Sequence, residues 1–279
     1  MFRSLLSLCV GMVVAAENVN LADPDLTKIK FFLWTRYIFS HGKILILIIF
    51  IDRQNQDDYD TVELTQESLA NSHFDSTHPT VILAHGWNSH GDGFGAHLSE
   101  AYFEVGDYNV FAIEWGDLET WANYPQAAIR TRAVGEHSAN LIKILSDVGA
   151  FQNIHVVGHS LGAHVAGFLA KKVQAMGLGT LERVTGLDPA EPFFDIAGPE
   201  ERIDKTDAKF VDIIHTNSGM LWNGCLSIKK SIGHVDIYPA GGSHQPGCVE
   251  ACIIPDIMCY NISIEDLIKV RTREFSSKM

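Results

Sequence analysis

Short, nearly continuous apolar runs alternate along this chain with segments of helical periodicity. The runs at 29–34, 80–84, 110–115, 154–157, 184–187 and 210–214 have the length and composition of strands. Apolar positions within 124–148 recur at helical spacing, and a second helix is predicted over 161–176, directly after the fourth run. Strands that alternate with helices and lack a polar face predict an α/β fold, with a mostly parallel sheet covered by helices on both faces.

Two other apolar segments do not fit this alternation. A basic start at Arg3, a short apolar run and small residues at plausible cleavage positions predict a secretory signal peptide over residues 1–16. The run at 39–51 is too short to cross a bilayer, which takes about 20 residues. No transmembrane segment is therefore predicted, and 39–51 is either an extra strand or an insertion foreign to the domain.

Composition narrows the class of protein. The chain has 279 residues, 46% of them hydrophobic, which suits one α/β domain over 17–279. A formal net charge of −13 argues against a nucleic-acid partner and against docking on anionic membranes by charge, but it permits contact with lipid through apolar surface. Removal of the signal peptide would leave four cysteines, which indicates two disulfides of open pairing or, as a weaker alternative, a zinc site: Cys225, Cys248, Cys252 and Cys259.

The strongest chemical signal is the sequence Gly-His-Ser-Leu-Gly at 158–162. It matches G-x-S-x-G and lies between a predicted strand and a predicted helix, which is the context of a nucleophile elbow. The alternative is a glycine-rich turn with an incidental serine. The elbow would present the Ser160 hydroxyl at the carboxyl end of the strand, near a helix N-terminus that favours developing negative charge.

Two further turns supply partners for such a serine. In this architecture one oxyanion donor comes from an early strand's exit loop and the other from the residue after the nucleophile, which here are the N–H groups of Trp87 and Leu161. Asp188 follows a later strand, and the order Ser…Asp…His makes it the candidate triad acid. Each turn could also be plain turn chemistry, a His-Gly pair in one case and an Asp-Pro pair in the other.

Six blocks in the same order resemble the pancreatic lipase family from about residue 29 to 248: IKFFLWTR, ILAHGW, VVGHSLGAHVAGF, VTGLDPAEP, DAKFVDIIHTN and GHVDIYPAGGSHQPGC. The resemblance implies a secreted α/β-hydrolase that cleaves glycerolipid esters through an acyl-enzyme on Ser160, with Asp188 as acid. No cofactor is implied for the chemistry. It also implies a structural calcium loop, with these ligands: Glu200, Arg202 through its carbonyl, Asp204 and Asp207. Carboxylate and carbonyl oxygens suit calcium, and the alternative is a solvated acidic loop.

The chain departs from the family at the triad histidine. The family places it in a Cys-x-His-x-Arg setting, but here Asn261 follows Cys259 at that position, and asparagine cannot act as a base. Asn261 also creates an N-glycosylation sequon. His215 and His234 match family histidines that are not catalytic. His244, in a glycine-rich loop, is therefore the candidate base.

The region after residue 248 bears on substrate and on activity. Cys248 could pair with Cys259 around a lid of ten residues, or with Cys252 around one of three, and a short lid resembles the phospholipase members rather than the triacylglycerol lipases. The domain is expected to be incomplete at its C-terminus and to lack the β-sandwich that some members add. The rival to a secreted lipase or phospholipase is a lipase-fold protein that binds lipid, or serves as yolk-like storage, without catalysis.

Overall fold

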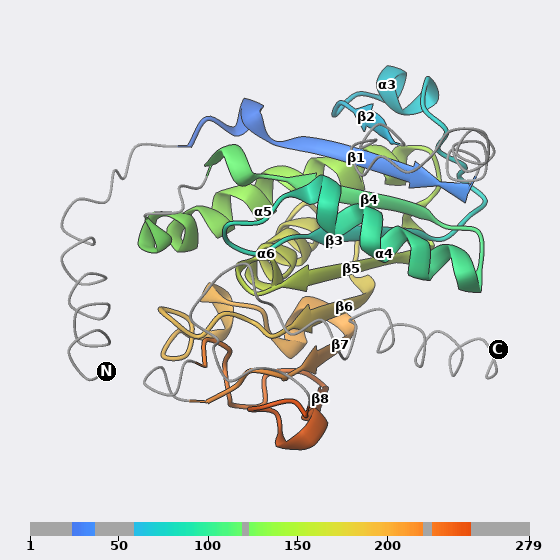
Figure 1. Ribbon diagram of the computed structural model, residues 1–279. Helices are drawn as coiled ribbons and strands as arrows, with labels where there is room; N and C mark the ends of the chain where they lie inside the picture. The colour runs from blue at the N-terminus through green and yellow to red at the C-terminus, as the bar shows by residue number, and fades with distance from the viewer. Residues whose placement is uncertain (1–23, 37–58, 119–122, 220–224, 247–279) are drawn as a thin grey trace, which may run out of the picture.

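The computed structural model describes residues 24–36, 59–118, 123–219 and 225–246 (Figure 1). The following predictions fall outside these residues and stay predictions: the signal peptide, the nature of the 39–51 run, any pairing of Cys248, Cys252 or Cys259, and the sequon at Asn261.

One sheet carries the fold. Its eight strands lie in the order β2-β1-β4-β3-β5-β6-β7-β8. Adjacent strands from β4 to β8 are parallel, whereas β1 is antiparallel to both β4 and β2. The strands are β1 (Lys30–Thr35), β2 (Asp60–Val62), β3 (Thr80–Ala84), β4 (Asn109–Glu114), β5 (Ile154–His159), β6 (Leu181–Leu187), β7 (Ala208–Ile214) and β8 (Val235–Ile237). This mostly parallel sheet confirms the predicted fold class.

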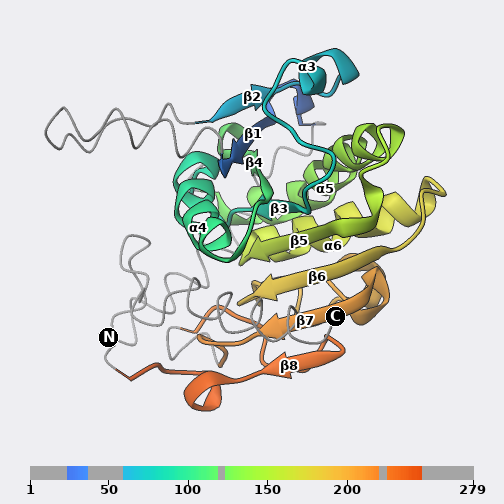
Figure 2. The ribbon, with the colours of Figure 1, turned by 90° about the vertical axis from the view of Figure 1, so that its right-hand side faces the viewer.

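Helices cover both faces of the sheet (Figure 2). Helix α4 (Gly91–Val105) lies on one face, and α5 (Tyr124–Asp147) and α6 (Leu161–Ala175) lie on the other. Strand β3 shows why its sequence has no polar side: Val81 and Leu83 enter the core under α4, while Ile82 and Ala84 enter the core under α5 and α6. Shorter elements connect these layers: α3 (Gln66–Ala70) and the 3-10 turns η1 (Leu26–Lys28), η2 (Gly116–Leu118), η3 (Phe151–Asn153), η4 (Pro199–Glu201), η5 (Lys205–Asp207) and η7 (Pro239–Gly241). The sheet and its two helical layers form an α/β-hydrolase fold.

Helix α4 was not predicted, and its glycines explain why. Glycine costs a helix about 1 kcal/mol relative to alanine, and α4 carries three glycines in its first five residues. Gly95 is required by packing, since a Cβ there would lie 2.4 Å from the Trp34 ring. Leu98 and Tyr102 are buried on the same side. Burial against the sheet, rather than local propensity, therefore makes this segment helical.

The topology places three loops together. Strands β3, β5 and β6 are neighbours and parallel, so their carboxyl ends meet at one edge of the sheet. His85 follows β3, Ser160 follows β5 and Asp188 follows β6. In open parallel sheets this edge is where ligands bind.

Candidate active site

The turn between β5 and α6 holds Ser160 in a strained conformation. Its φ is 55° and its ψ is −120°, and positive φ is uncommon for a residue with a side chain. A Cβ at Gly158 would lie 2.1 Å from the Gly162 carbonyl oxygen, and a Cβ at Gly162 would lie 2.2 Å from the Ala84 oxygen. The two flanking glycines are thus required by close backbone contact. Strain that the surroundings maintain in this way is typical of functional sites.

The loop after β3 packs directly against this serine. A Cβ on Gly86 would lie 2.9 Å from the Ser160 Cβ. The buried His85 ring donates from Nδ1 to the Gly86 carbonyl at 2.9 Å and accepts the Trp115 N–H at Nε2 at 3.2 Å. In a trans peptide the C=O and N–H point in opposite directions. Because His85 fixes the Gly86 carbonyl, it also fixes the direction of the Trp87 N–H, the predicted oxyanion donor.

Glu114 ties this loop to the start of α4. Its carboxylate accepts the Gly91 N–H at 2.7 Å and the Gly116 N–H at 2.6 Å, and it lies 3.6 Å from His85 Nε2. Burial acts to raise the pKa of Glu114, but contact with His85 and these two N–H donors hold it at about 2. The residue is therefore a buried anion that anchors the loop between β3 and α4, which carries Trp87.

The second predicted oxyanion donor stands at the start of a helix. Leu161 is the first residue of α6, so its N–H has no acceptor within the helix. The Ser160 N–H is bonded to the Leu187 carbonyl at 2.9 Å, which fixes the turn against the end of β6. The N-terminal end of α6 thus faces the region where Ser160 stands, and the helix dipole favours negative charge there.

The candidate acid is held by the loop after β7. Asp188 has a φ of 45° and its carboxylate accepts the backbone N–H groups of Thr216 at 2.7 Å and Asn217 at 3.0 Å. The Thr216 hydroxyl donates to its second oxygen. The backbone N–H of Asp188 donates to the Ile214 carbonyl at 2.8 Å. These donors orient the carboxylate at the sheet edge that carries Ser160.

None of the histidines in the described ranges bonds to Asp188. His215 is fully buried, with Nδ1 bonded to the Ile228 carbonyl and Nε2 to Asp236, each at 2.8 Å. His234 accepts the Val211 N–H at Nδ1. His244 is exposed and makes no hydrogen bond to another described residue. The structure thus brings Ser160 and Asp188 to one edge but does not join His244 to them.

The loop of His244 nevertheless runs beside the one that holds Asp188. Gln245 donates from its amide to the Thr216 carbonyl at 2.9 Å, and Thr216 is the residue that binds the Asp188 carboxylate. The Ser218 N–H donates to the Gly242 carbonyl at 2.7 Å. His244 directly precedes Gln245 in this loop, so it stays the candidate base.

Another histidine near the nucleophile is structural. His164, fully buried on α6, accepts the Ile203 N–H at 3.3 Å, is bonded to the Ala190 carbonyl at 2.9 Å, and stacks on Phe194 with ring centroids 3.6 Å apart. Burial lowers its pKa to about 3. With both ring nitrogens engaged, His164 is a packing residue.

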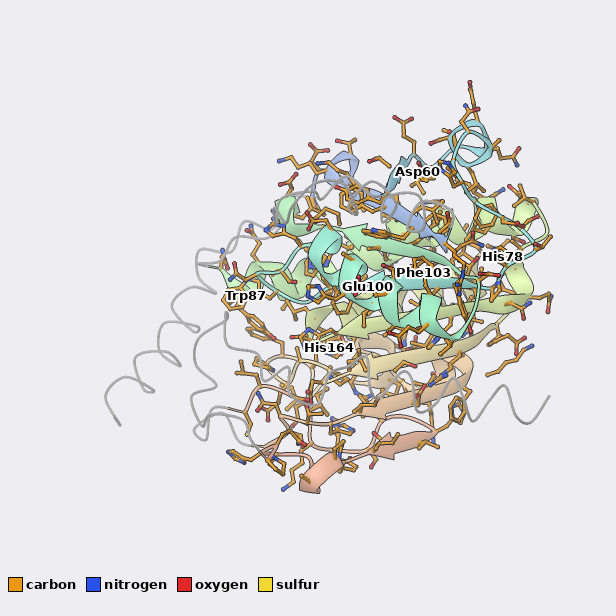
Figure 3. All side chains as sticks on the ribbon, turned by 45° about the vertical axis from the view of Figure 1, so that its right-hand side comes forward. Asp60, His78, Trp87, Glu100, Phe103 and His164 are labelled. Carbon is orange, nitrogen blue, oxygen red and sulfur yellow. The ribbon has the colours of Figure 1, made fainter. Side chains whose placement is uncertain are left out.

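A series of aromatic rings starts at Trp87, in the loop between β3 and α4. Trp87 lies at the sheet edge where the parallel strands end (Figure 3). Its ring meets Tyr124 edge to face with centroids 5.3 Å apart, and Tyr124 stacks on Phe193 at 6.2 Å. Phe193 is 51% exposed and has a φ of 75°, an outlier for a bulky residue. These three rings give the site an apolar border that reaches the protein surface.

The predicted calcium ligands do not form a cation cage of oxygens alone. Lys171, on α6, places its ammonium 3.0 Å from the Arg202 carbonyl oxygen and donates to the Asp207 carboxylate. Glu200 is exposed, and its carbonyl accepts from Arg132 at 2.7 Å. The donor set as folded does not fit a bound calcium ion.

Three residues of this site were not predicted as functional. His85 was noted only for the turn that it begins, Glu114 was part of an apolar strand, and Thr216 was not singled out. A carboxylate at the end of an otherwise apolar strand was the signal for Glu114. The roles of His85 and Thr216 depend on contacts between separate loops, which no local pattern reveals.

This chain has the sheet of an α/β-hydrolase domain, and Ser160 stands at the nucleophile position in a strained turn. The loop that carries Gly86 packs against that turn. The chain belongs to the Lipase family, whose model matches residues 12–265. This match confirms the resemblance to pancreatic lipases.

Two curated relatives agree with this assignment. The chain is 36% identical over 214 residues to pancreatic triacylglycerol lipase of Mus musculus, covering 75% of this chain and 45% of that protein. It is 40% identical over 175 residues to lipase member H-B of Xenopus laevis, covering 62% of this chain and 36% of that protein. The chain thus spans less than half the length of these curated relatives. Among solved structures, the mature form of a Bacillus licheniformis lipase is similar to this chain at 13% sequence identity and a TM-score of 0.33. The similarity covers 54% of this chain and 71% of that one.

Within the described ranges, none of the helices combines the length and the apolar character needed to cross a bilayer.

Proposed function

We propose that this chain is a secreted serine carboxyl-ester hydrolase that acts on glycerolipids through an acyl-enzyme on Ser160. The observation that carries the proposal is the strained Ser160 turn, with the Gly86 backbone packed against it and the start of α6 behind it. Secretion is supported by the apolar N-terminal run and the even number of remaining cysteines.

The proposed reaction has two halves. The Ser160 hydroxyl attacks the ester carbonyl while His244 accepts its proton, and the N–H groups of Trp87 and Leu161 stabilise the oxyanion. The tetrahedral intermediate expels the alcohol, which takes the proton from His244, and leaves the acyl group on Ser160. Water then attacks the acyl-enzyme by the same route. Asp188 orients the protonated ring, a role that typically contributes several powers of ten in rate.

A lipid substrate is supported by the chemistry at the site border. Trp87, Tyr124 and Phe193 offer an apolar surface for an acyl chain next to the oxyanion donors. Two relatives are named as a triacylglycerol lipase and as lipase member H-B. The short spacing from Cys248 to Cys259 favours phospholipid over triacylglycerol, since a large lid is not needed for dispersed substrates.

Hydrolysis assays test the proposal. The purified secreted chain is incubated with dispersed phospholipid and with a triacylglycerol emulsion, and released fatty acid is measured beside Ser160→Ala and His244→Ala variants. We expect release from phospholipid that both substitutions reduce by at least about 10³-fold. Release that Ser160→Ala leaves unchanged would refute the serine mechanism.

A catalytically silent lipid-binding protein is the second candidate. It is favoured by one observation: Asp188 is bonded to Thr216 and Asn217 and to no histidine among the described residues. In this case phospholipid vesicles bind the chain without release of fatty acid. Substitution of Asn261→His, at the position where the family carries its histidine, should then create activity that a second Ser160→Ala change removes.

A further inference from the structure

A half-buried lysine lies where the sequence predicts a structural calcium ion. Lys171 Nζ is 3.0 Å from the Arg202 carbonyl oxygen and donates to the Asp207 carboxylate, both of which were predicted calcium ligands. The Lys171 and Asp207 side chains are only 16% and 1% exposed. A divalent ion bound to the same two oxygens would stand next to an ammonium group, and like charges at that distance repel strongly.

The two buried carboxylates of this loop are already paired with cations of the chain. Asp204, the other predicted carboxylate ligand, faces the Arg202 guanidinium at 3.3 Å, with each side chain 9% exposed. Asp204 also accepts the Thr206 N–H at 3.1 Å. Two buried carboxylates are therefore matched by two cations of the chain itself, Lys171 and Arg202. Calcium sites instead present excess negative charge and free oxygens to the ion.

One face of α6 is built to receive the loop. His164, Gly167, Lys171 and Gln174 follow one another at spacings of three or four residues, so they share a side of the helix. His164 accepts the N–H of Ile203, and Gln174 donates to the carbonyls of the 3-10 turn η5.

Gly167 makes this approach close enough for a lysine. A Cβ at Gly167 would lie 2.7 Å from the Ile203 Cα and 2.9 Å from the Asp207 Oδ2 atom. The backbone of the loop therefore rests directly on the helix, one turn before Lys171. From there the lysine side chain reaches the carbonyl oxygen of Arg202 and the carboxylate of Asp207.

We propose that the Lys171 ammonium is the resident cation of the loop at 198–207 and replaces calcium there, so that the fold of this chain does not depend on a divalent metal. The loop is fixed to α6, the helix that begins after Ser160. Lys171 is thus a structural cation supplied by the chain, whether or not the serine is catalytic.

The first test uses the unaltered protein. Thermal unfolding is followed after exhaustive dialysis against a calcium chelator and after addition of excess calcium. We expect the same melting temperature in both conditions, and no heat of calcium binding by titration calorimetry. A melting temperature that falls on chelation and recovers with calcium would overturn the proposal.

The second test uses a matched pair of variants. Lys171→Met keeps the length of the side chain but removes the charge, while Lys172→Met makes the same change at the next residue, which has no ion pair among the described residues. Loss of one partner of a buried ion pair should lower the melting temperature by roughly 10 °C. Lys172→Met should leave it nearly unchanged. Equal effects of the two substitutions would contradict the proposal, and if Lys171→Met does not fold, the chelation experiment on the unaltered protein decides.

Discussion

The substitution Glu114→Gln removes a buried charge behind the loop between β3 and α4 while keeping the shape of the side chain. Glu114 accepts two backbone N–H groups, from Gly91 and Gly116, through its two oxygens. Glutamine has a single acceptor oxygen, so one of these N–H groups would face an amide NH2 group instead. The loop that carries His85, Gly86 and Trp87 would lose part of its anchor.

The size of the effect follows from two estimates. An N–H group left without an acceptor in a buried site costs about 1–3 kcal/mol. The fall of the Glu114 pKa from 4.5 to about 2 corresponds to about 3 kcal/mol at neutral pH. Contact with His85 and the two backbone donors together hold this pKa down, and the substitution weakens both. We therefore expect Glu114→Gln to lower the free energy of unfolding by about 2–3 kcal/mol.

The pH dependence separates this explanation from simple loss of packing. A depressed carboxyl pKa contributes stability that is complete above pH 4.5 and is lost as the pH falls toward 2. The stability gap between Glu114→Gln and the unaltered protein should therefore be constant near neutrality and narrow progressively below pH 4.5.

Urea unfolding at a series of pH values, followed by tryptophan fluorescence, measures the gap. Glu100→Gln, on the exposed side of α4 (Figure 3), is the matched control and should change stability by less than about 0.5 kcal/mol. A gap that is absent at neutral pH, or that persists unchanged in acid, would refute this account of Glu114.

Other positions give equally definite expectations. Gly162→Ala should prevent accumulation of soluble protein, because its Cβ would lie 2.2 Å from the Ala84 oxygen. Gly93→Ala in α4 has no atom within 4 Å of its Cβ and should stabilise the protein by about 0.5–1 kcal/mol. Expression yield measures the first effect, and urea unfolding measures the second. Arg183→Met should destabilise by about 3–5 kcal/mol in urea melts, since Arg183 pairs through two nitrogens with the fully buried Asp212 at 3.0 and 2.8 Å, and an effect below 1 kcal/mol would contradict that role.

Much of the sheet could be predicted from local pattern. Strand β3 and its parallel neighbours have apolar residues on both faces, and a short run with no polar side is a clear signal. Strands β2 and β8 have three residues each, with polar residues among them, so no run marks them. Helix α4 was missed because its glycines oppose helix formation locally, while packing against Trp34 requires Gly95.

The site could be predicted only in part. Ser160, Asp188 and the two donor positions lie at the ends of strands, so sequence order and topology bring them to one edge. Lys171 lies 36 residues before Asp207 in the chain, and only the packing of α6 against the loop joins them. A ligand set read from one contiguous loop therefore could not reveal that a cation from a distant helix would enter it.

The most direct test of the central claim is the reaction of the folded protein with a fluorophosphonate, because this probe requires a serine whose proton is removed by a working base. Intact mass and peptide mapping of the secreted chain would be compared with Ser160→Ala. The account predicts one phosphonyl adduct per chain, on Ser160, and none in the variant. Folded protein that remains unmodified would contradict an activated nucleophile and leave the lipid-binding candidate.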